Sequence, residues 1–338
     1  MEYEMASPVP ETNFTTFTKF IMKPYTTNTT QTLCDLPANE VFIFAYSLLF
    51  LVSLVLNCIT MWVYFCSNYN VQSSVTVYMK NLVAADFFLC LCLPLRIAAY
   101  ANNSEIMSNI YCSFGATAFY INMYASILFM DFIAANRYLK IVHPVETHAL
   151  QTVRTAYYIS VATWLSLLAM ASVYLTLFLQ NFLGQKPDAF TCESRFSSQL
   201  SVTYKIIHCL TFVVFIVILV SLILLYWKTH QKLREVQSSS QVSFRSQTFK
   251  RSKHNMLVLV VIFCVCFVPY HLVKLPYIFV KPLLRDCTAT QPFYILKELT
   301  IVLAALNVSL DPLIYFFFCK TFRAHFNLST RSYQPRRE

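Results

Sequence analysis

Two carboxylates lie in segments that are otherwise apolar, where ionisable groups are costly and therefore indicate function. Asp311 follows Asn307 by four residues, which places both on one face of a helix, and Asp86 lies in an earlier apolar segment. Ser126 and Asn57 are expected at a similar depth. These oxygens could bind a small hard cation such as sodium, share a proton between two carboxylates, or form only a hydrogen-bond network between helices.

A second polar set, mostly cations and tyrosines, lies near the ends of the apolar segments that are predicted below to face outward. His271 and Lys274 are three residues apart, hence on one helix face, and Glu298 is the one acidic residue there. Several cations and hydroxyls suit an anionic ligand, above all phosphate. The alternative is that each cation extends to the membrane interface. The predicted ligand-binding residues are Arg96, Tyr120, Tyr124, His208, His271, Lys274 and Lys297.

Composition predicts that membrane-spanning helices position both sets. The chain has 338 residues, 57% hydrophobic and 12% charged, against about 25% charged in soluble domains. Its apolar runs, about 20–30 residues long, suit helices and not the strands of a barrel. We therefore predict an all-α membrane protein, a bundle with spans at 41–66, 74–100, 109–140, 153–180, 199–228, 250–280 and 292–318.

The segments outside the spans complete the predicted organisation. Residues 1–40 form an N-terminal segment, 41–318 the seven-helix domain and 319–338 a short tail. The tail begins with a predicted amphipathic helix on the membrane surface, Lys320–Phe326. The longest internal loop is expected from Lys228 to Lys253.

Charge distribution predicts the orientation of the bundle. Outside the spans, lysine and arginine concentrate after the third and fifth spans and in the tail, which places these in the cytoplasm and the N-terminus outside. The glycosylation sequons at Asn13, Asn28 and Asn102 then all face outward, as glycosylation requires. We expect a multi-pass protein of the cell membrane. The net charge of +10 fits this topology, and no nucleic-acid surface is predicted.

Four of the 12 cysteines lie outside the spans, all on the predicted outer, oxidising side. They are Cys34, Cys112, Cys192 and Cys287, and they permit three pairings. We favour Cys112–Cys192, joining the start of the third helix to the second outer loop, and Cys34–Cys287.

Two further motifs lie on predicted helices. Arg137 ends the third helix, where its charge could simply extend into water. Pro269 removes a backbone hydrogen bond from the sixth helix and would act as a hinge.

With these motifs, the chain resembles the rhodopsin-like (class A) G-protein-coupled receptors. The resemblance rests on Asn57, Asp86, Cys112, Asn136-Arg137-Tyr138, Trp164, Cys192, the run Phe263–Pro269 and Asp311-Pro312-Leu313-Ile314-Tyr315.

This resemblance implies a ligand cavity on the outer side, an outward movement of the sixth helix about Pro269, and a heterotrimeric G protein and arrestin as cytoplasmic partners. It implies that Tyr315 reorients toward Arg137. Asn136 stands where the family usually has an acid, so the inactive state should be less stable. The implied switch residues are Asn136, Arg137, Tyr138, Phe267, Pro269, Asp311, Pro312 and Tyr315, and the implied sodium ligands are Asp86, Ser126, Asn307 and Asp311.

Within that family, the chain resembles the purinergic receptors for ADP and UDP-sugars and their orphan relatives. The likeness rests on the segments around His271 and Lys274, around Cys287, and at Lys297-Glu298. It implies a nucleotide or sugar nucleotide ligand, the inhibitory class of G protein and the Cys34–Cys287 pairing. Lys274 replaces the usual arginine, and there and at Asn136 the chain also resembles the platelet-activating-factor receptor. A phospholipid ligand is therefore the alternative.

Other functions have less support in the sequence. We find no Ser/His/Asp order, no metal-spaced His or Cys cluster and no glycine-rich phosphate loop, so an enzyme is not expected. A transporter remains a distant alternative, because no inverted repeat is evident. No cofactor is predicted apart from an allosteric sodium ion.

Overall fold

The computed structural model describes residues 39–66, 73–101, 105–142, 148–184, 197–238, 243–283 and 287–318. Seven of its helices are long and apolar enough to cross a membrane, so the predicted fold class is confirmed. The sequons, Cys34, Cys192 and the predicted tail helix lie outside the described residues. The long helices are α2 (Asn39–Met61), α3 (Ser74–Ala101), α5 (Ala116–Val142), α6 (Val153–Gly184), α7 (Ser198–Ser238), α8 (Ser243–Val280) and α9 (Cys287–Phe318).

Short helical segments extend or join these helices. The π-helical η1 (Trp62–Cys66) continues α2, while α4 (Glu105–Ile110) and η2 (Tyr111–Gly115) lead into α5. The 3-10 turns η3 (Ala149–Gln151) and η5 (Lys281–Leu283) precede α6 and follow α8.

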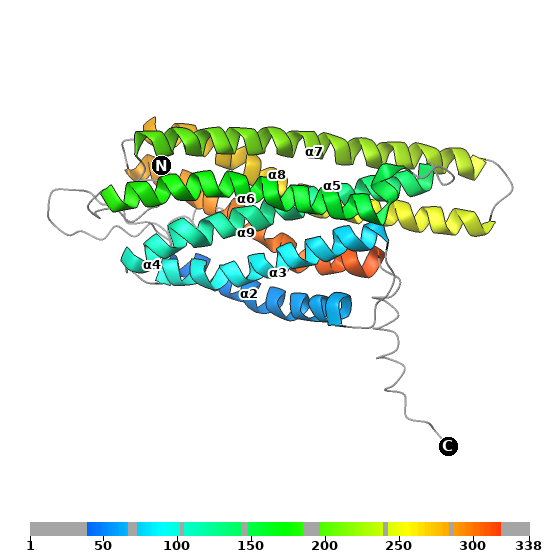
Figure 1. The fold of residues 1–338 in the computed structure, drawn as a ribbon, viewed down its shortest axis with the longest axis horizontal. Coiled ribbons are helices and arrows are strands. Elements are labelled where there is room, and N and C mark those ends of the chain that lie inside the picture. The colour runs from blue at the N-terminus through cyan, green and yellow to red at the C-terminus, as the bar shows by residue number, and fades with distance from the viewer. Residues whose placement is uncertain are drawn as a thin grey trace, which may run out of the picture.

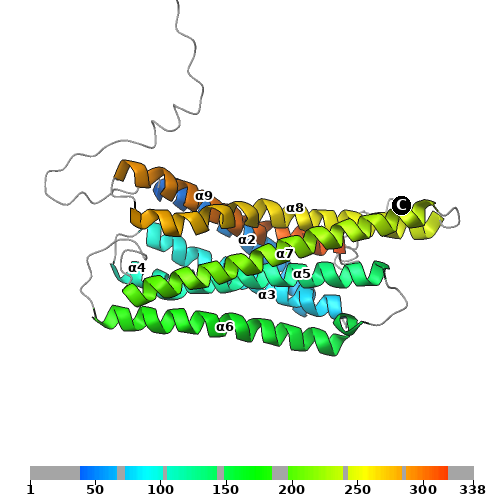
Figure 2. The same ribbon diagram turned by 90° about the horizontal axis from the view of Figure 1, so that it is seen from above.

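The long helices form one bundle that runs along the long axis of Figure 1. Contacts link α2, α3, α5, α7, α8 and α9 in that order and return from α9 to α2, so these six close a ring. α6 lies outside it, against α3 and α5, and is also at the edge of the bundle in Figure 2. α3 and α9 also contact each other directly across this ring, although they are distant in sequence.

The fifth and sixth spans extend beyond their predicted bounds. α7 continues to Ser238 and α8 begins at Ser243, so the expected loop from Lys228 to Lys253 is wrong for the described residues. Hydropathy marks where a helix leaves hydrocarbon and not where it ends. The extension of α7 keeps strong helix formers, and its Lys232 pairs with Glu235 at 2.9 Å one turn on.

Aromatic side chains fill the centre of the bundle. Phe215 of α7 stacks on the His271 ring of α8 with a centroid distance of 3.8 Å and an interplanar angle of 2°. Phe263 and Phe267 of α8 are fully buried beside it. Large apolar side chains such as Phe44 and Leu51 of α2 are instead exposed, as expected for helices that face lipid.

Buried polar groups find partners on other helices. Pro312 has no N–H, so the carbonyl of Val308 one turn earlier lacks its usual helical donor. The Asn57 amide of α2 donates to that carbonyl at 3.0 Å. Asn81 of α3 accepts from Trp164 Nε1 at 2.9 Å and donates to Ser160 Oγ at 3.1 Å, which joins α3 to α6.

Replacing Asn81 by leucine tests this last contact. Trp164 Nε1 would lose its acceptor in an apolar setting, so Asn81→Leu should lower stability by about 1–3 kcal/mol, measured by thermal unfolding of the purified protein in detergent. In the double variant with Trp164→Phe no donor is left unpaired, so it should be more stable than Asn81→Leu alone. An equal loss in both would contradict this account.

Candidate functional site

The polar cluster in the middle of the bundle joins three helices. Asp86 of α3 accepts from Tyr315 of α9 at 2.6 Å and from Ser126 of α5 at 3.2 Å. Asn307 donates to Asp311 one turn further along α9 at 3.4 Å, and the Asp311 and Asp86 carboxyl groups are neighbours. All five side chains are buried. The four predicted sodium ligands are thus brought together, and Tyr315 joins them.

Some oxygens of this cluster have no hydrogen-bond donor among the described residues. They are Asp311 Oδ1 and Asn307 Oδ1, both buried. An unpaired buried oxygen is costly, and a hard cation takes carboxylate, amide and hydroxyl oxygens as ligands. Asp86, Ser126, Asn307 and Asp311 therefore fit a sodium ion, which would neutralise buried negative charge.

The predicted cations Arg96 and Lys297 meet at one carboxylate. Arg96 of α3 pairs through a terminal guanidinium nitrogen with Glu298 Oε2 at 2.7 Å, and Lys297 Nζ pairs with Glu298 Oε1 at 2.7 Å. Tyr100 OH donates to Glu298 Oε2 at 2.5 Å. The sequence indicated that Glu298 was the one acid among these cations, but not that it bridges two of them.

Aromatic rings surround the cations. The Arg96 guanidinium lies 4.8 Å from the Tyr46 ring centroid and 5.4 Å from that of Phe119. The Tyr277 ring has Lys274, Lys281 and Lys297 at 5.8, 5.8 and 5.1 Å. Rings stabilise such charges where water is excluded. The three lysine ammonium groups thus lie within 5.8 Å of the centroid of one ring, that of Tyr277.

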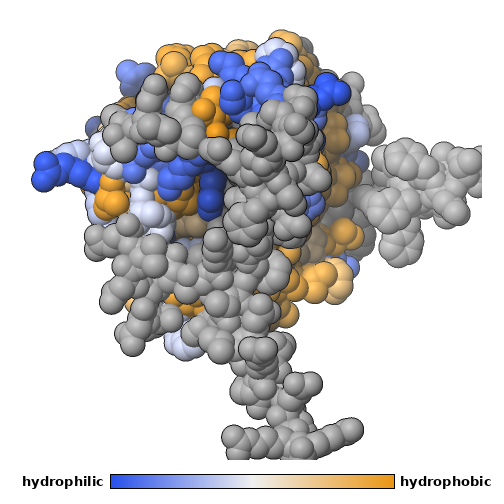
Figure 3. Space-filling model, turned by 90° about the vertical axis from the view of Figure 1, so that its right-hand side faces the viewer, coloured by the Kyte–Doolittle hydropathy of each residue, from blue (hydrophilic) through white to orange (hydrophobic). Residues whose placement is uncertain are grey.

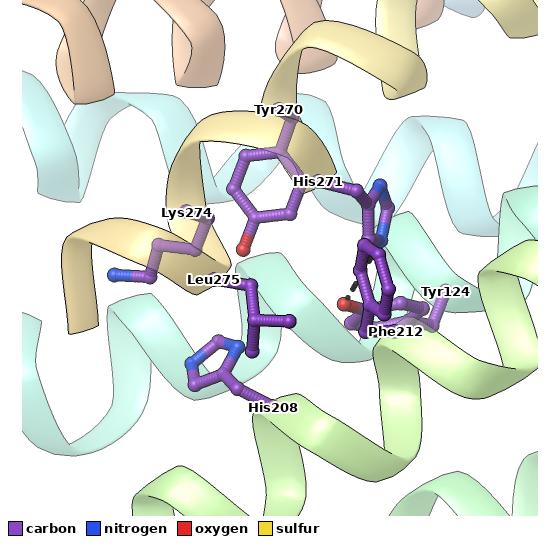
Figure 4. A pocket seen from close by; sticks show the side chains of 7 residues that line it. All are labelled: Tyr124, His208, Phe212, Tyr270, His271, Lys274 and Leu275. Atoms are coloured by element: carbon purple, nitrogen blue, oxygen red, sulfur yellow. Dashed lines mark hydrogen bonds between the residues drawn. The ribbon is translucent and has the colours of Figure 1, made fainter. Parts of the chain in front are cut away.

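The remaining predicted ligand residues line or border a cavity next to these lysines. Figure 4 shows its lining by Tyr124, His208, Phe212, Tyr270, His271, Lys274 and Leu275. Tyr120 does not line the cavity but contacts two residues that do, with its ring centroid 5.8 Å from that of His208 and 6.3 Å from that of Tyr270. The cavity volume is only about 10 Å³, room for about one water molecule and far below the roughly 300–1,000 Å³ of ligand pockets. A ligand of nucleotide size would therefore need the lining side chains to move.

His271 has both ring nitrogens engaged within the bundle. Nδ1 lies 2.8 Å from the carbonyl oxygen of Phe267, which can only accept, so Nδ1 carries a proton. Nε2 lies 3.2 Å from Tyr124 OH and can accept from it. His271 thus links the cavity wall on α5 to the turn of α8 that precedes Pro269.

The opposite end of the bundle carries the predicted switch residues of α5. Figure 3 looks onto this end, where hydrophilic side chains gather among apolar flanks. Asn136 is buried, and its amide nitrogen donates to Ser74 Oγ and to the Leu150 carbonyl, both at 2.8 Å. Arg137 and Tyr138, which follow it on α5, are partly buried.

Two further features bear on the sequence predictions. Asp131 of α5 accepts from Ser221 of α7 at 2.9 Å, a contact that the sequence did not identify. Cys112 is disulfide-bonded. Its predicted partner Cys192 lies outside the described residues, as does the side chain of Cys287, so both pairings stay predictions.

Comparisons with known proteins agree with this architecture. The family model described as 7 transmembrane receptor (rhodopsin family) matches residues 56–315. G-protein coupled receptor 87 of Mus musculus is 34% identical over 302 residues, covering 85% of this chain and 80% of its own. A purinoceptor of Bos taurus, type 14, is 32% identical, covering 82% of each chain. Lysophosphatidic acid receptor 6 of Gallus gallus is 29% identical, covering 80% and 88%.

The unpaired oxygens of the central cluster lead to a prediction about sodium. Purified protein should unfold at a higher temperature in sodium chloride than in choline chloride of equal ionic strength, with a gain of about 1.4 kcal/mol at ten times the dissociation constant. Asp86→Asn and Asp311→Asn should abolish the difference. Asp131→Asn, which removes a carboxylate outside the cluster, should retain it. Equal unfolding temperatures in both salts would favour the purely structural network.

Proposed function

Since the chain belongs to the rhodopsin family of seven-transmembrane receptors, we propose that it binds a small anionic, phosphate-bearing ligand at the lysines around Tyr277. We propose further that the bound receptor signals to a heterotrimeric G protein of the inhibitory class. The chain is a G-protein-coupled receptor and a multi-pass membrane protein, and its relatives are named as receptors and not as enzymes. We place it in the cell membrane with the N-terminus and the cation cluster outside, as its charge distribution predicts.

The convergence of Lys274, Lys281 and Lys297 on one ring carries the ligand proposal. Three lysine charges within 5.8 Å of one centroid repel one another. A phosphate group, which accepts several hydrogen bonds at once, would relieve that repulsion. The neighbouring cavity, with its aromatic rings, two histidines and the Tyr270 hydroxyl, would take the uncharged part of the ligand.

The aromatic rings that line the cavity favour a nucleotide or a sugar nucleotide as the ligand. Rings such as Phe212 and His208 can stack on a planar base, and Tyr270 OH is buried without a partner among the described residues. The kinship with the Bos taurus purinoceptor supports this class, and that with lysophosphatidic acid receptor 6 supports a phospholipid as the alternative. Calcium or cAMP responses to ADP, UDP-glucose, lysophosphatidic acid and platelet-activating factor would separate the two.

On the cytoplasmic side, we assign coupling to Asn136, Arg137 and Tyr138 at the end of α5, with Phe267 and Pro269 as the hinge of α8. Asp311, Pro312 and Tyr315 would pass the change along α9, with Tyr315 leaving Asp86 on activation. Arrestin would bind the same face. Ligand-dependent nucleotide exchange on a purified G protein tests this assignment, whereas substrate flux in liposomes without exchange would support a transporter.

Removing individual lysine charges tests the anion site. Lys274→Gln and Lys297→Gln should each weaken the active ligand of that panel about 10–100-fold, from ~1.5–3 kcal/mol per charge-assisted hydrogen bond, measured as the half-maximal concentration for G-protein activation. Lys205→Gln is the control: the Lys205 ammonium lies over the Phe279 ring and is not one of the three described at Tyr277, so this change should alter potency little. Unchanged potency in both test variants would refute the site.

Asn136 makes basal signalling a second test. Asn136→Asp places a carboxylate beside Arg137 but loses the hydrogen bond to the Leu150 carbonyl. A charge-assisted contact is about twice as strong as a neutral one, so basal nucleotide exchange should fall. Asn136→Ala adds no charge and should not lower exchange. Identical basal exchange in the native receptor and Asn136→Asp would contradict the prediction.

A further inference from the structure

Glu298 is shared between two cations that bind different oxygens. Arg96 and Tyr100 occupy Oε2, and Lys297 occupies Oε1. Arg96 and Glu298 are each about 3% exposed at their side chains, whereas Lys297 is about 10% exposed. A ligand that enters between the helices would therefore meet Lys297 before it met the other two.

Arg96 has a buried donor without a partner. Its Nε makes no hydrogen bond among the described residues. A guanidinium normally binds a carboxylate through two parallel hydrogen bonds, one to each oxygen. Here one terminal nitrogen binds Oε2, while the oxygen that a second bond would need is held by Lys297. The unpaired Nε is thus explained by the position of the lysine.

We propose that Lys297 is a transferable partner, held by Glu298 in this state and passed to the anionic ligand on binding, and that Glu298 Oε1 then accepts from Arg96 Nε. This inference rests on the proposed function. It makes Glu298 a competitor of the ligand for Lys297, and Arg96 a positioning residue that does not contact the ligand. When Lys297 leaves, Glu298 gains a second hydrogen bond from Arg96. Because this bond offsets the lost lysine contact, it lowers the free-energy cost of releasing Lys297.

The exchange changes the contact between α3 and α9. Arg96 lies on α3, ten residues beyond Asp86, and Glu298 lies on α9, the helix of Asp311 and Tyr315. The same two helices are therefore joined at two levels, by the Arg96–Glu298 pair and by the Tyr315–Asp86 hydrogen bond at 2.6 Å. A tighter, two-bond Arg96–Glu298 pair would shift the helices against each other and bias the central contact.

Lys297→Met tests the proposal without any ligand. It frees Glu298 Oε1 but leaves one buried cation and one buried anion, so no charge is stranded. Basal nucleotide exchange on the inhibitory G protein should rise by about threefold or more, because a minor active state of ~0.1–10% leaves room for that increase. Lys205→Met is the matched control and should leave basal exchange unchanged.

Adding Arg96→Lys to Lys297→Met should cancel the increase, since an ammonium keeps the charge but cannot form the two-bond fork. Unfolding temperatures of all variants would be measured in parallel. Unchanged basal exchange in Lys297→Met would overturn the proposal, as would an increase that survives Arg96→Lys. The outcome is separate from that of the anion site, because Lys274→Gln could keep full potency while Lys297→Met still raises basal exchange.

Discussion

The hydrogen bond from Tyr315 to Asp86 holds α9 against α3 in the middle of the bundle, and the surrounding polar groups are arranged about it. A carboxylate so deep needs donors, and Tyr315 and Ser126 supply two from different helices. Asn57 then satisfies the Val308 carbonyl that Pro312 leaves open, so α2 is tied to the same segment. The part of α9 around Pro312 is therefore stabilised directly from α3 and α2, and through Asp86 also from α5, and a change in any of these helices alters its energy.

The same cost of burial accounts for the cation cluster. Arg96 and Lys297 are kept in an apolar setting by Glu298 and by tyrosine and phenylalanine rings, because neither would be stable there alone. One carboxylate cannot balance both Arg96 and Lys297. The described Arg96–Glu298–Lys297 group therefore carries a net positive charge, and an anion beside Lys297 would stabilise it.

Much of this could be predicted from sequence because a membrane restricts what a chain can do. Long apolar runs placed all seven spans, and the cost of buried charge identified Asp86, Asp311 and the outer cations. The extension of α7 past Lys228 could not be predicted from hydropathy, because hydropathy identifies segments that lie in hydrocarbon and does not report helices that continue into water. Pairings such as Glu298 with Arg96, or Asp131 with Ser221, could not be predicted because they depend on how helices far apart in sequence are rotated toward each other.

His271 gives the cavity a direct mechanical connection to the hinge. Its Nδ1 holds the Phe267 carbonyl two residues before Pro269, where the proline has already removed one backbone hydrogen bond. Its ring stacks on Phe215 of α7 and meets Tyr124 of α5, which lines the cavity. A ligand that displaced Tyr124 or rotated His271 would disturb the weakest turn of α8 first. The Arg96–Glu298 pair and the His271 contact thus act on different helices, α9 and α8, from one end of the bundle.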